Sequence, residues 1–242
     1  MPAQELSHSH HLPKQETTQE HLETDRETTE LLKLIFEQHP FLAHVKINFV
    51  SPEDEPNTGG FFHRVKIDEH TFVPTVTIVL KDTKHLEQLM KTRAPSVAHA
   101  ARMLGIKIEE LSTDLLSQFI IAHEFGHATD YIKNYETNPD YHAAEATQEW
   151  DTHYDANLLT LPVPGFDPVD LMEEVSQFHD VDTFFQTHPE VQHTISGVKI
   201  KNLRELVDAQ EFAYRASTYE NYADQFAVNF LRRNSEALGI KN

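Results

Sequence analysis

The sequence contains no cysteine, and it has only 7 glycines and 1 tryptophan among its 242 residues. The absence of cysteine excludes disulfide bonds, zinc sites built on thiolates and a cysteine nucleophile. Any metal site in this chain must therefore use histidine and carboxylate ligands. The chain has 17 histidines, so imidazole ligands are plentiful.

Positive charge is also scarce, since 20 Lys and Arg stand against 39 Asp and Glu, a formal net charge of −19. Nucleic acids and anionic membranes are polyanions, so this charge argues against both as partners. Residues 96–112 have the outline of a helix-turn-helix, but Glu109 and Glu110 would begin its second helix and repel phosphate. An acidic surface would instead attract basic substrates.

Long hydrophobic runs are missing as well. Apolar stretches such as residues 119–122 are far too short to span a bilayer. The N-terminal segment, residues 1–26, is polar, lacks the apolar region of a secretory signal and predicts a disordered tail. We therefore expect a soluble protein that is cytoplasmic by default, or secreted if a signal is missing from this chain; no oligomeric state is predicted.

Hydrophobic periodicity predicts an α+β fold with a small, mostly antiparallel sheet. A helix over 27–38 precedes strands over 44–50, 61–67 and 75–80. After residue 80 the pattern is helical, and the expected helices cover 84–92, 95–104, 113–133, much of 134–217, and 218–238. Because no Pro/Gly/Ser-rich linker divides the chain, we expect residues 27–242 to form one domain with a helical insert at about 134–217.

His123, Glu124 and His127 form the motif that carries chemistry. Histidines four residues apart lie on one face of a helix, where two imidazoles can bind one metal ion. Glu124 lies about 100° further round the helix, close enough to contact a water on that metal. Zinc lowers the pKa of such a water, and an adjacent carboxylate can accept its proton. This is the physical reason for the H-E-x-x-H pattern of zinc metallopeptidases.

The surrounding helix predicts that the two histidines are buried. Leu111, Leu115 and Phe119 precede them at four-residue spacing, so the pair continues an apolar stripe. Buried imidazoles need partners, which a metal ion supplies; the alternative is an ordinary helix whose histidines are satisfied by hydrogen bonds. Gly126, between the histidines, would allow another backbone to approach closely.

A third ligand must come from a downstream carboxylate. Glu220 is the preferred candidate, because Asp224 follows four residues later on the same helix face and could hydrogen-bond a ligand histidine. Ala223 and Ala227 would provide small packing positions beside the metal. The acidic segment 145–155 is the alternative source of this ligand, although its composition favours a solvated acidic helix face.

The string His123-Glu-Phe-Gly-His127, followed by Glu220-x-x-Ala-Asp224-x-Phe-Ala, resembles the gluzincin metallopeptidases. Residues 123–131 look like the catalytic domains of the lethal-factor and Pro-Pro endopeptidase type, and residues 214–224 are similar to compact minimal gluzincins. The resemblance covers residues 110–133 and 212–232. It implies a metallopeptidase-like domain of zincin-like fold with one zinc ion on His123, His127 and Glu220.

The resemblance also implies a function, a zinc-dependent endopeptidase that hydrolyses peptide or protein substrates. Glu124 would be the general base and would pass the proton to the leaving amine. Tyr214, near the spacing seen in lethal-factor-like enzymes, would stabilise the oxyanion, with His188 and His193 as weaker alternatives. The alternative function is a catalytically silent protein of the same fold that acts as a binding, inhibitor or scaffold protein.

The β-branched strand at 75–80 has two interpretations. In enzymes of this class an edge strand near the active-site helix pairs with an extended substrate, and this strand could be that edge. It could equally be the central strand of a small sheet.

Overall fold

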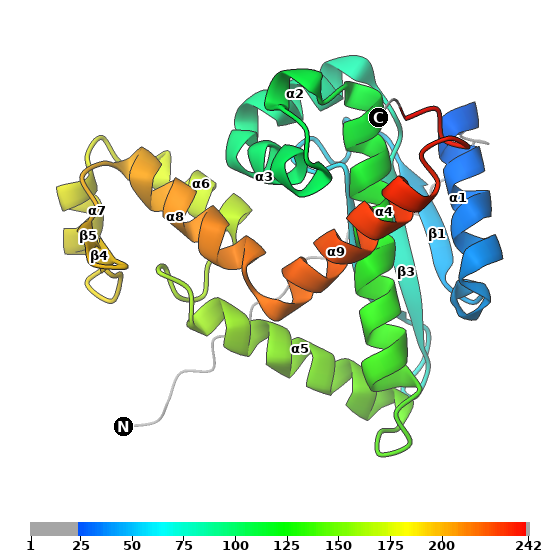
Figure 1. Cartoon of the computed structure of the whole chain (residues 1–242). Helices are drawn as coiled ribbons and strands as arrows, with labels where there is room; N and C mark the ends of the chain where they lie inside the picture. Colours follow the sequence, from blue (N-terminus) through cyan, green and yellow to red (C-terminus); the bar gives the residue numbers. More distant parts are fainter. Residues whose placement is uncertain (1–23, 241–242) are drawn as a thin grey trace.

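The computed structural model describes residues 24–240 of the chain, and Figure 1 shows the arrangement of their helices and strands. The elements are α1 (Arg26–Gln38), β1 (Lys46–Val50), β2 (Gly60–Lys66), β3 (Phe72–Val79), α2 (Thr83–Thr92), α3 (Ala94–Leu104), α4 (Thr113–Tyr131), α5 (Ala143–Leu159), α6 (Pro168–Val175), α7 (Val181–Thr187), β4 (Thr194–Ile195), β5 (Val198–Lys199), α8 (Leu203–Arg215) and α9 (Thr218–Arg233). This order confirms the α+β class, whereas the finer, zincin-like assignment stays a prediction.

The predicted elements are present, with ends that differ by a few residues. The largest difference is in α9, which ends at Arg233 instead of residue 238. Helix α4 is followed by a π-helical turn over Ile132–Glu136, where a continuous helix to residue 133 is predicted. The predicted tail, residues 1–26, lies mostly outside the described residues, and Arg26 already belongs to α1.

Helix ends follow local sequence signals. The side chain of Asp25 accepts a hydrogen bond from the backbone N–H of Thr28 at the start of α1, and Ser112 does the same for α4. Helix α3 stops at Gly105, whose φ of 79° places it in the left-handed region that favours glycine. These caps set the direction in which α4 leaves the preceding turn.

The main sheet has the strand order β1-β3-β2, with β1 parallel and β2 antiparallel to β3. The sheet is therefore mixed, which corrects the prediction of a mostly antiparallel sheet. The strand predicted at 75–80 lies in β3, the central strand, so its interpretation as a substrate-pairing edge is wrong. Thr75 and Thr77 are as deeply buried as Val76 between them, because both faces of β3 are covered. Strand β2 forms an edge of this sheet.

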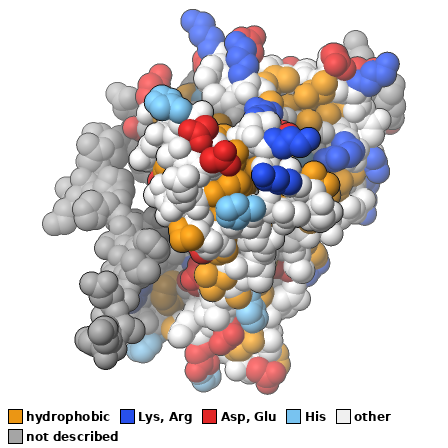
Figure 2. All heavy atoms as spheres, turned by 90° about the vertical axis from the view of Figure 1, so that its left-hand side faces the viewer, with side chains coloured by type: hydrophobic (Ala, Val, Ile, Leu, Met, Phe, Trp, Pro, Cys, Tyr) orange, Lys and Arg blue, Asp and Glu red, His pale blue; other side chains and the backbone are white. Residues whose placement is uncertain are grey.

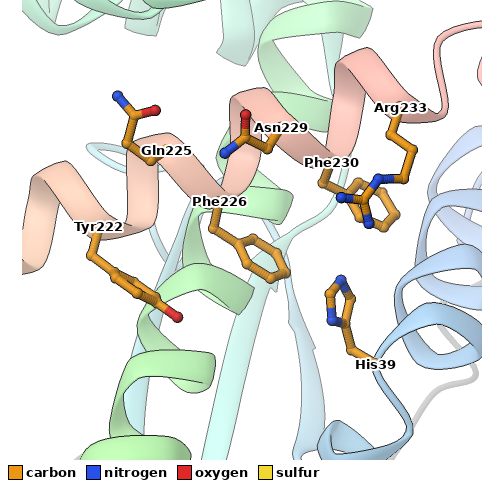
Figure 3. A pocket seen from close by; sticks show the side chains of 7 residues that line it. All are labelled: His39, Tyr222, Gln225, Phe226, Asn229, Phe230 and Arg233. Atoms are coloured by element: carbon orange, nitrogen blue, oxygen red, sulfur yellow. The ribbon is translucent and has the colours of Figure 1, made fainter.

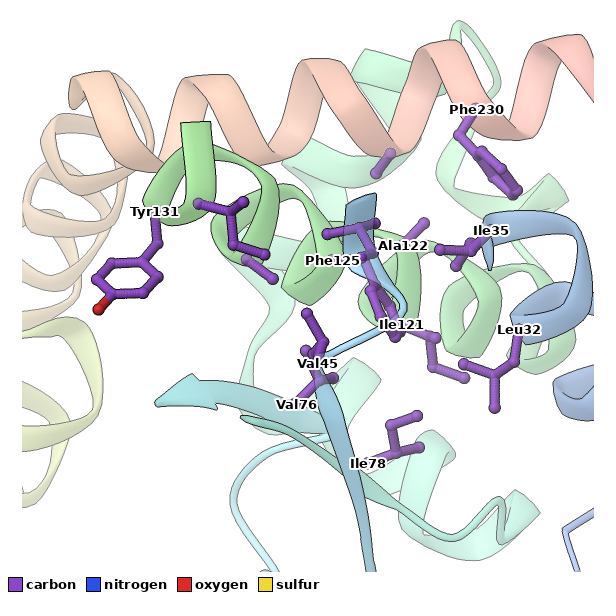
Figure 4. Packing of buried hydrophobic residues seen from close by; sticks show 14 of the residues in the cluster. Leu32, Ile35, Val45, Val76, Ile78, Ile121, Ala122, Phe125, Tyr131 and Phe230 are labelled. Carbon is purple, nitrogen blue, oxygen red and sulfur yellow. The ribbon is translucent and has the colours of Figure 1, made fainter. Parts of the chain in front are cut away.

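One hydrophobic cluster holds α4 against the sheet. Figure 4 shows Ile121 and Phe125 of α4 directed toward Val76 and Ile78 of β3, with Ile35 of α1 beside them. Buried aliphatic side chains stabilise the fold by roughly 1.5–3 kcal/mol each. The cluster continues to α9 through Phe230, so the sheet, α1, α4 and α9 share one core.

The insert packs around a second hydrophobic cluster. Its members come from α6, α7, α8 and their connecting segments, and they include Leu171, Phe184 and Leu206. These elements lie to one side of α4 and α9 in Figure 1, whereas α5 runs along the end of α4. The prediction of a mostly helical insert is confirmed, but the short antiparallel pair β4–β5 is not predicted from the sequence. The prediction that residues 27–242 form a single domain stays a prediction.

The surface carries both signs of charge despite the net excess of acids. Figure 2 shows the face at the left of Figure 1, where acidic and basic side chains alternate with apolar ones. Net charge therefore says little about the charge at a particular site. Within residues 24–240, no helix combines the length and the apolar character needed to cross a membrane.

Candidate metal centre

Helix α4 carries His123, Glu124 and His127, and all three side chains are buried. The two histidines are only 6% and 8% exposed, which confirms the prediction that they are buried. The predicted stripe does not explain this burial on its own, because nearly every residue of α4 from Leu116 to Tyr131 is buried. The helix is enclosed on most sides by the sheet, α5 and α9.

Helix α9 lies unusually close to α4 at Gly126. A Cβ atom added to Gly126 would lie 2.6 Å from the Cα of Ala223 and 2.9 Å from its carbonyl oxygen. Only glycine permits this approach, so the predicted close backbone contact is confirmed. Glu220 lies one helical turn before Ala223, so the close approach of the two helices brings it next to the side chains of the two histidines.

Three ligand atoms converge between α4 and α9. The Nε2 atoms of His123 and His127 lie 3.0 Å apart. Glu220 Oε1 lies 3.2 Å from the Nε2 of His127, and Glu220 Oε2 lies 3.4 Å from the Nε2 of His123. All three side chains are buried, and this group could hold a metal ion. The structure thus brings Glu220, and not the 145–155 segment, to the histidine pair.

The spacing of these atoms suits a small tetrahedral cation. Ligand atoms at about 2.0–2.1 Å from a tetrahedral zinc are separated from one another by about 3.3 Å. The two Nε2 atoms are 3.0 Å apart, and each has a different Glu220 oxygen at 3.2 or 3.4 Å, so these contacts are near that value. Two imidazoles and one carboxylate form the His₂Glu set that catalytic zinc sites use, and such sites leave the fourth position to water.

Asp224 orients His123 through the ring nitrogen that does not face the site. Its Oδ1 lies 2.8 Å from the Nδ1 of His123, and its Oδ2 lies 2.8 Å from the Nε2 of His99. A carboxylate can only accept, so the Nδ1–H of His123 donates and its Nε2 atom faces the site. The predicted hydrogen bond from a ligand histidine to Asp224 is present. His99 on α3 is not predicted from the sequence.

Arg215 is a second unpredicted neighbour of the site. Its Nη1 donates to Glu220 Oε2 at 2.7 Å, and its Nε donates to Glu211 Oε1 at 3.0 Å. Glu211 also accepts a hydrogen bond from Ser96 of α3. One signal for Arg215 is its position five residues before Glu220, at the end of α8, where basic residues are favoured.

The electrostatics of the group favour a positive charge at its centre. Burial lowers the pKa of His123, but hydrogen bonds to Asp224 and Glu220 outweigh this and raise that pKa to about 10. Burial acts to raise the pKa of Glu220, but His127 and Arg215 hold it well below the ordinary value. The carboxylates therefore stay charged and attract a cation, which is either a proton or a metal ion.

Glu124 lies beside this group at the surface of a large cleft. Its side chain lines the cleft, is only 8% exposed, and accepts no hydrogen bond from any residue that the structure describes. Gly60 of β2 approaches it, since a Cβ on Gly60 would lie 3.4 Å from the Cγ of Glu124. A carboxylate that is shielded but unpaired is well suited to accept a proton from a reacting water.

Tyr214 also faces the cleft and is paired with an unpredicted residue. Its hydroxyl lies 3.0 Å from the hydroxyl of Tyr154 on α5. Burial, followed by the nearby charge of Glu220, raises the pKa of both phenols above the ordinary value. Both therefore stay protonated, and one O–H of the pair remains free to donate into the cleft.

The other sequence candidates lie away from the ligand atoms. The 145–155 segment belongs to α5, where Asp151 forms an ion pair with Arg64 of β2. His188 stacks on Phe184 in the core of the insert. His193 stacks on Phe185. His188 and His193, the weaker oxyanion candidates, therefore pack against aromatic side chains of the insert.

The cleft itself has a volume of about 1700 Å³. One wall comes from β2, α2, α3 and α4, and the other from α5, α6 and the end of α8. The insert wall contributes most of the lining acids, namely Asp151, Asp155, Asp167, Asp170, Glu173 and Glu174. A cleft of this size exceeds the usual range for small-molecule pockets and can accept a chain segment.

A second, smaller hollow lies on the opposite face of α9. It has a volume of about 220 Å³, and Figure 3 shows Phe226 and Phe230 of α9 beside His39. Its lining contains no carboxylate, so it lacks the ligands of a metal site.

Comparisons of this chain with protein-family models, with curated proteins and with solved structures find no match.

Proposed function

We propose that this protein is a zinc-dependent endopeptidase of gluzincin type. The observation that carries the proposal is the convergence of the His123 and His127 Nε2 atoms with the Glu220 carboxylate, directly beside the unpaired carboxylate of Glu124. The four residues lie on the wall of a cleft large enough for a peptide. Zinc is the proposed ion because the ligand set, the spacing and the absence of thiolates all suit it.

The roles of the residues follow from their positions. Bound zinc would lower the pKa of a coordinated water and polarise the scissile carbonyl. Glu124 would accept one proton from the attacking water while the water oxygen bonds to the carbonyl carbon and the C=O π pair moves onto the carbonyl oxygen. The C–N bond then breaks, and Glu124 returns the proton to the departing amine. Tyr214 donates a hydrogen bond to the carbonyl oxygen as negative charge develops there, with Tyr154 orienting it.

Strand β2 supports the proposal that the substrate is an extended chain. It is an edge strand of the main sheet, and its first residues line the cleft next to Glu124. The Thr58 hydroxyl already bonds the N–H and C=O of Gly60, so a substrate main chain would pair with backbone groups farther along this edge. This proposal moves the substrate-pairing role from the central strand β3 to β2.

A catalytically silent binding, inhibitor or scaffold protein is the competing proposal. It requires the same cleft but no metal-dependent chemistry. The two differ in one property that can be measured, which is hydrolysis that depends on the Glu124 carboxylate.

The test uses zinc-loaded protein and a mixture of unstructured peptides, with cleavage followed by mass spectrometry. The Glu124→Gln variant keeps the shape of the side chain but removes the base, and we expect peptide cleavage to fall by at least about 1000-fold. The matched control is Glu149→Gln in α5, a half-exposed carboxylate that does not line the cleft. Its activity should equal that of the wild type. Wild-type protein that binds zinc and cleaves no peptide would favour the silent binding protein.

A further inference from the structure

Arg215 is the last residue of α8 and lies among three buried carboxylates. Its Nη1 donates to Glu220 Oε2 at 2.7 Å and lies 3.7 Å from Asp224 Oδ1, and its Nε donates to Glu211 Oε1 at 3.0 Å. The arginine side chain is 15% exposed, and the three acids are between 1% and 6% exposed. One guanidinium thus compensates a buried group of negative charges.

We propose that Arg215 is a positioning residue of the metal centre: it holds the Oε2 atom of Glu220 and so directs Oε1 toward His127. The inference rests on the proposed metal-binding function of His123, His127 and Glu220. Arg215 contacts the metal centre from α8, which belongs to the insert, whereas the proposed ligands lie on α4 and α9.

The geometry of a guanidinium is what the role requires. Its planar fork can bridge two carboxylates at fixed angles, whereas a lysine ammonium is a flexible point charge. Here the fork joins Glu211 on α8 to Glu220 on α9 across the short break between the helices. The backbone of Glu220 is held separately, since Ser217 caps α9 and accepts from the Glu220 N–H. Both the backbone and the side chain of the ligand are therefore fixed.

The charge balance supports the same role. Without Arg215, three buried carboxylates would lie close together with fewer positive partners, and their mutual repulsion would favour protonation or rotation of one of them. Glu220 would then present its oxygen less often in the position suited to a cation. The competing role is the opposite one, in which the arginine that holds Glu220 competes with a metal ion for the same carboxylate. The two roles predict opposite changes in metal affinity.

The insert determines where Arg215 lies. Leu203, Leu206 and Val207, earlier in α8, pack in the second hydrophobic cluster together with α6 and α7. Gln210 of the same helix is fully buried and hydrogen-bonds the backbone of Val163. The packing of the insert therefore sets the position of the end of α8, and through Arg215 it reaches the ligand Glu220.

The test compares the Zn²⁺ affinity of Arg215→Lys with that of the wild-type chain by chelator competition. We expect the variant to bind Zn²⁺ about 10–100-fold more weakly, as is typical when a group that orients a metal ligand is changed. The visible spectrum of the Co²⁺-saturated protein should also change, because it reports the ligand geometry at full occupancy. The matched control is Arg204→Lys, an exposed arginine of the same helix paired with Asp208 at i, i+4, which should leave both readouts unchanged.

Equal or tighter Zn²⁺ binding by a folded Arg215→Lys variant, with a wild-type Co²⁺ spectrum, would overturn the positioning role. If that variant does not fold, Glu211→Gln takes its place, since it removes the charge that anchors the Nε of Arg215 and leaves an amide oxygen for Ser96. It should weaken Zn²⁺ binding severalfold and alter the Co²⁺ spectrum, and unchanged values would again overturn the inference. These outcomes are separate from those of the peptidase proposal, because neither readout uses a peptide.

Discussion

The Nδ1 atom of His123 lies 2.8 Å from the Oδ1 atom of Asp224, and both side chains are buried. This pairing fixes the tautomer of His123, since the carboxylate requires a donor at Nδ1. The Nε2 atom is then directed at His127 and Glu220. Burial acts to raise the pKa of Asp224, but its hydrogen bonds with His123 and His99 hold that pKa below the ordinary value. The aspartate is therefore a charged acceptor at neutral pH.

Replacing Asp224 by asparagine should weaken zinc binding without removing it. An amide oxygen can still accept from His123, but it lacks the charge that makes the imidazole a stronger ligand. We expect the Zn²⁺ dissociation constant to rise by about 10–100-fold in chelator competition. Asp208→Asn, at an exposed position in α8, is the control and should not change affinity. Unchanged affinity in Asp224→Asn would show that the charge of Asp224 has no role in metal binding.

Gly126→Ala should destabilise the fold, although alanine normally favours a helix by about 1 kcal/mol over glycine. The new methyl would meet the backbone of Ala223 at 2.6 Å, so α4 and α9 would have to separate. We expect the free energy of unfolding to fall by about 1–3 kcal/mol in urea denaturation, together with weaker zinc binding. Asn221→Ala, on the exposed side of α9, should change stability by less than about 0.5 kcal/mol. A more stable Gly126→Ala variant would contradict the close approach of the two helices.

The motif and its ligands can be predicted from sequence because their spacings are local. His123 and His127 share a helix face, as do Glu220 and Asp224, and each pair depends on only one turn of helix. The residues that contact this group from other helices are not linked to it by a local spacing. His99 and Tyr154 come from α3 and α5, far from the motif in sequence, and no period links them to it. Only tertiary packing brings them to the site.

The hydrogen-bonded hydroxyls of Tyr214 and Tyr154 should affect kcat more than KM. Tyr214→Phe removes the proposed donor to the developing oxyanion, so kcat should fall by about 100-fold while KM stays nearly constant. Tyr154→Phe should have a smaller effect, because it removes only the partner that orients Tyr214. Tyr222→Phe, on the opposite face of α9, is the control and should be fully active. Equal activity of Tyr214→Phe and the wild type would assign the oxyanion role to another group.

Stability should fall as the pH rises above the ordinary tyrosine pKa of 10.0, because the pKa of Tyr154 in the folded protein is raised. Above this pH the unfolded chain loses a proton that the folded chain retains, so unfolding becomes more favourable with increasing pH. Burial is the main cause, followed by the charge of Glu220. Urea denaturation at a series of pH values between about 9 and 11 should show a shallower pH dependence for Tyr154→Phe than for the wild type. Parallel curves would mean that Tyr154 does not contribute.

The fold class and most helices and strands could be predicted from the sequence, but the order and direction in which the strands pair could not. The β-branched run of β3 predicts a strand, but its sequence leaves open whether that strand lies at an edge or at the centre of the sheet. In the structure Thr75 and Thr77 are buried, because β3 lies between two strands and both its faces are covered. Strand order and direction depend on long-range pairing, which the local pattern does not encode. The short hairpin of β4 and β5 has too few residues to show a period.

The most direct test of the account is the zinc content of the purified chain after loading and exhaustive dialysis, measured by elemental analysis. We predict about one zinc ion per wild-type chain. His123→Ala and Glu220→Gln should lose most of it, whereas His153→Ala, a half-exposed histidine of the 145–155 segment, should retain it. A wild-type chain without tightly bound zinc, or one whose zinc survives in both ligand variants, would contradict the proposed metal centre.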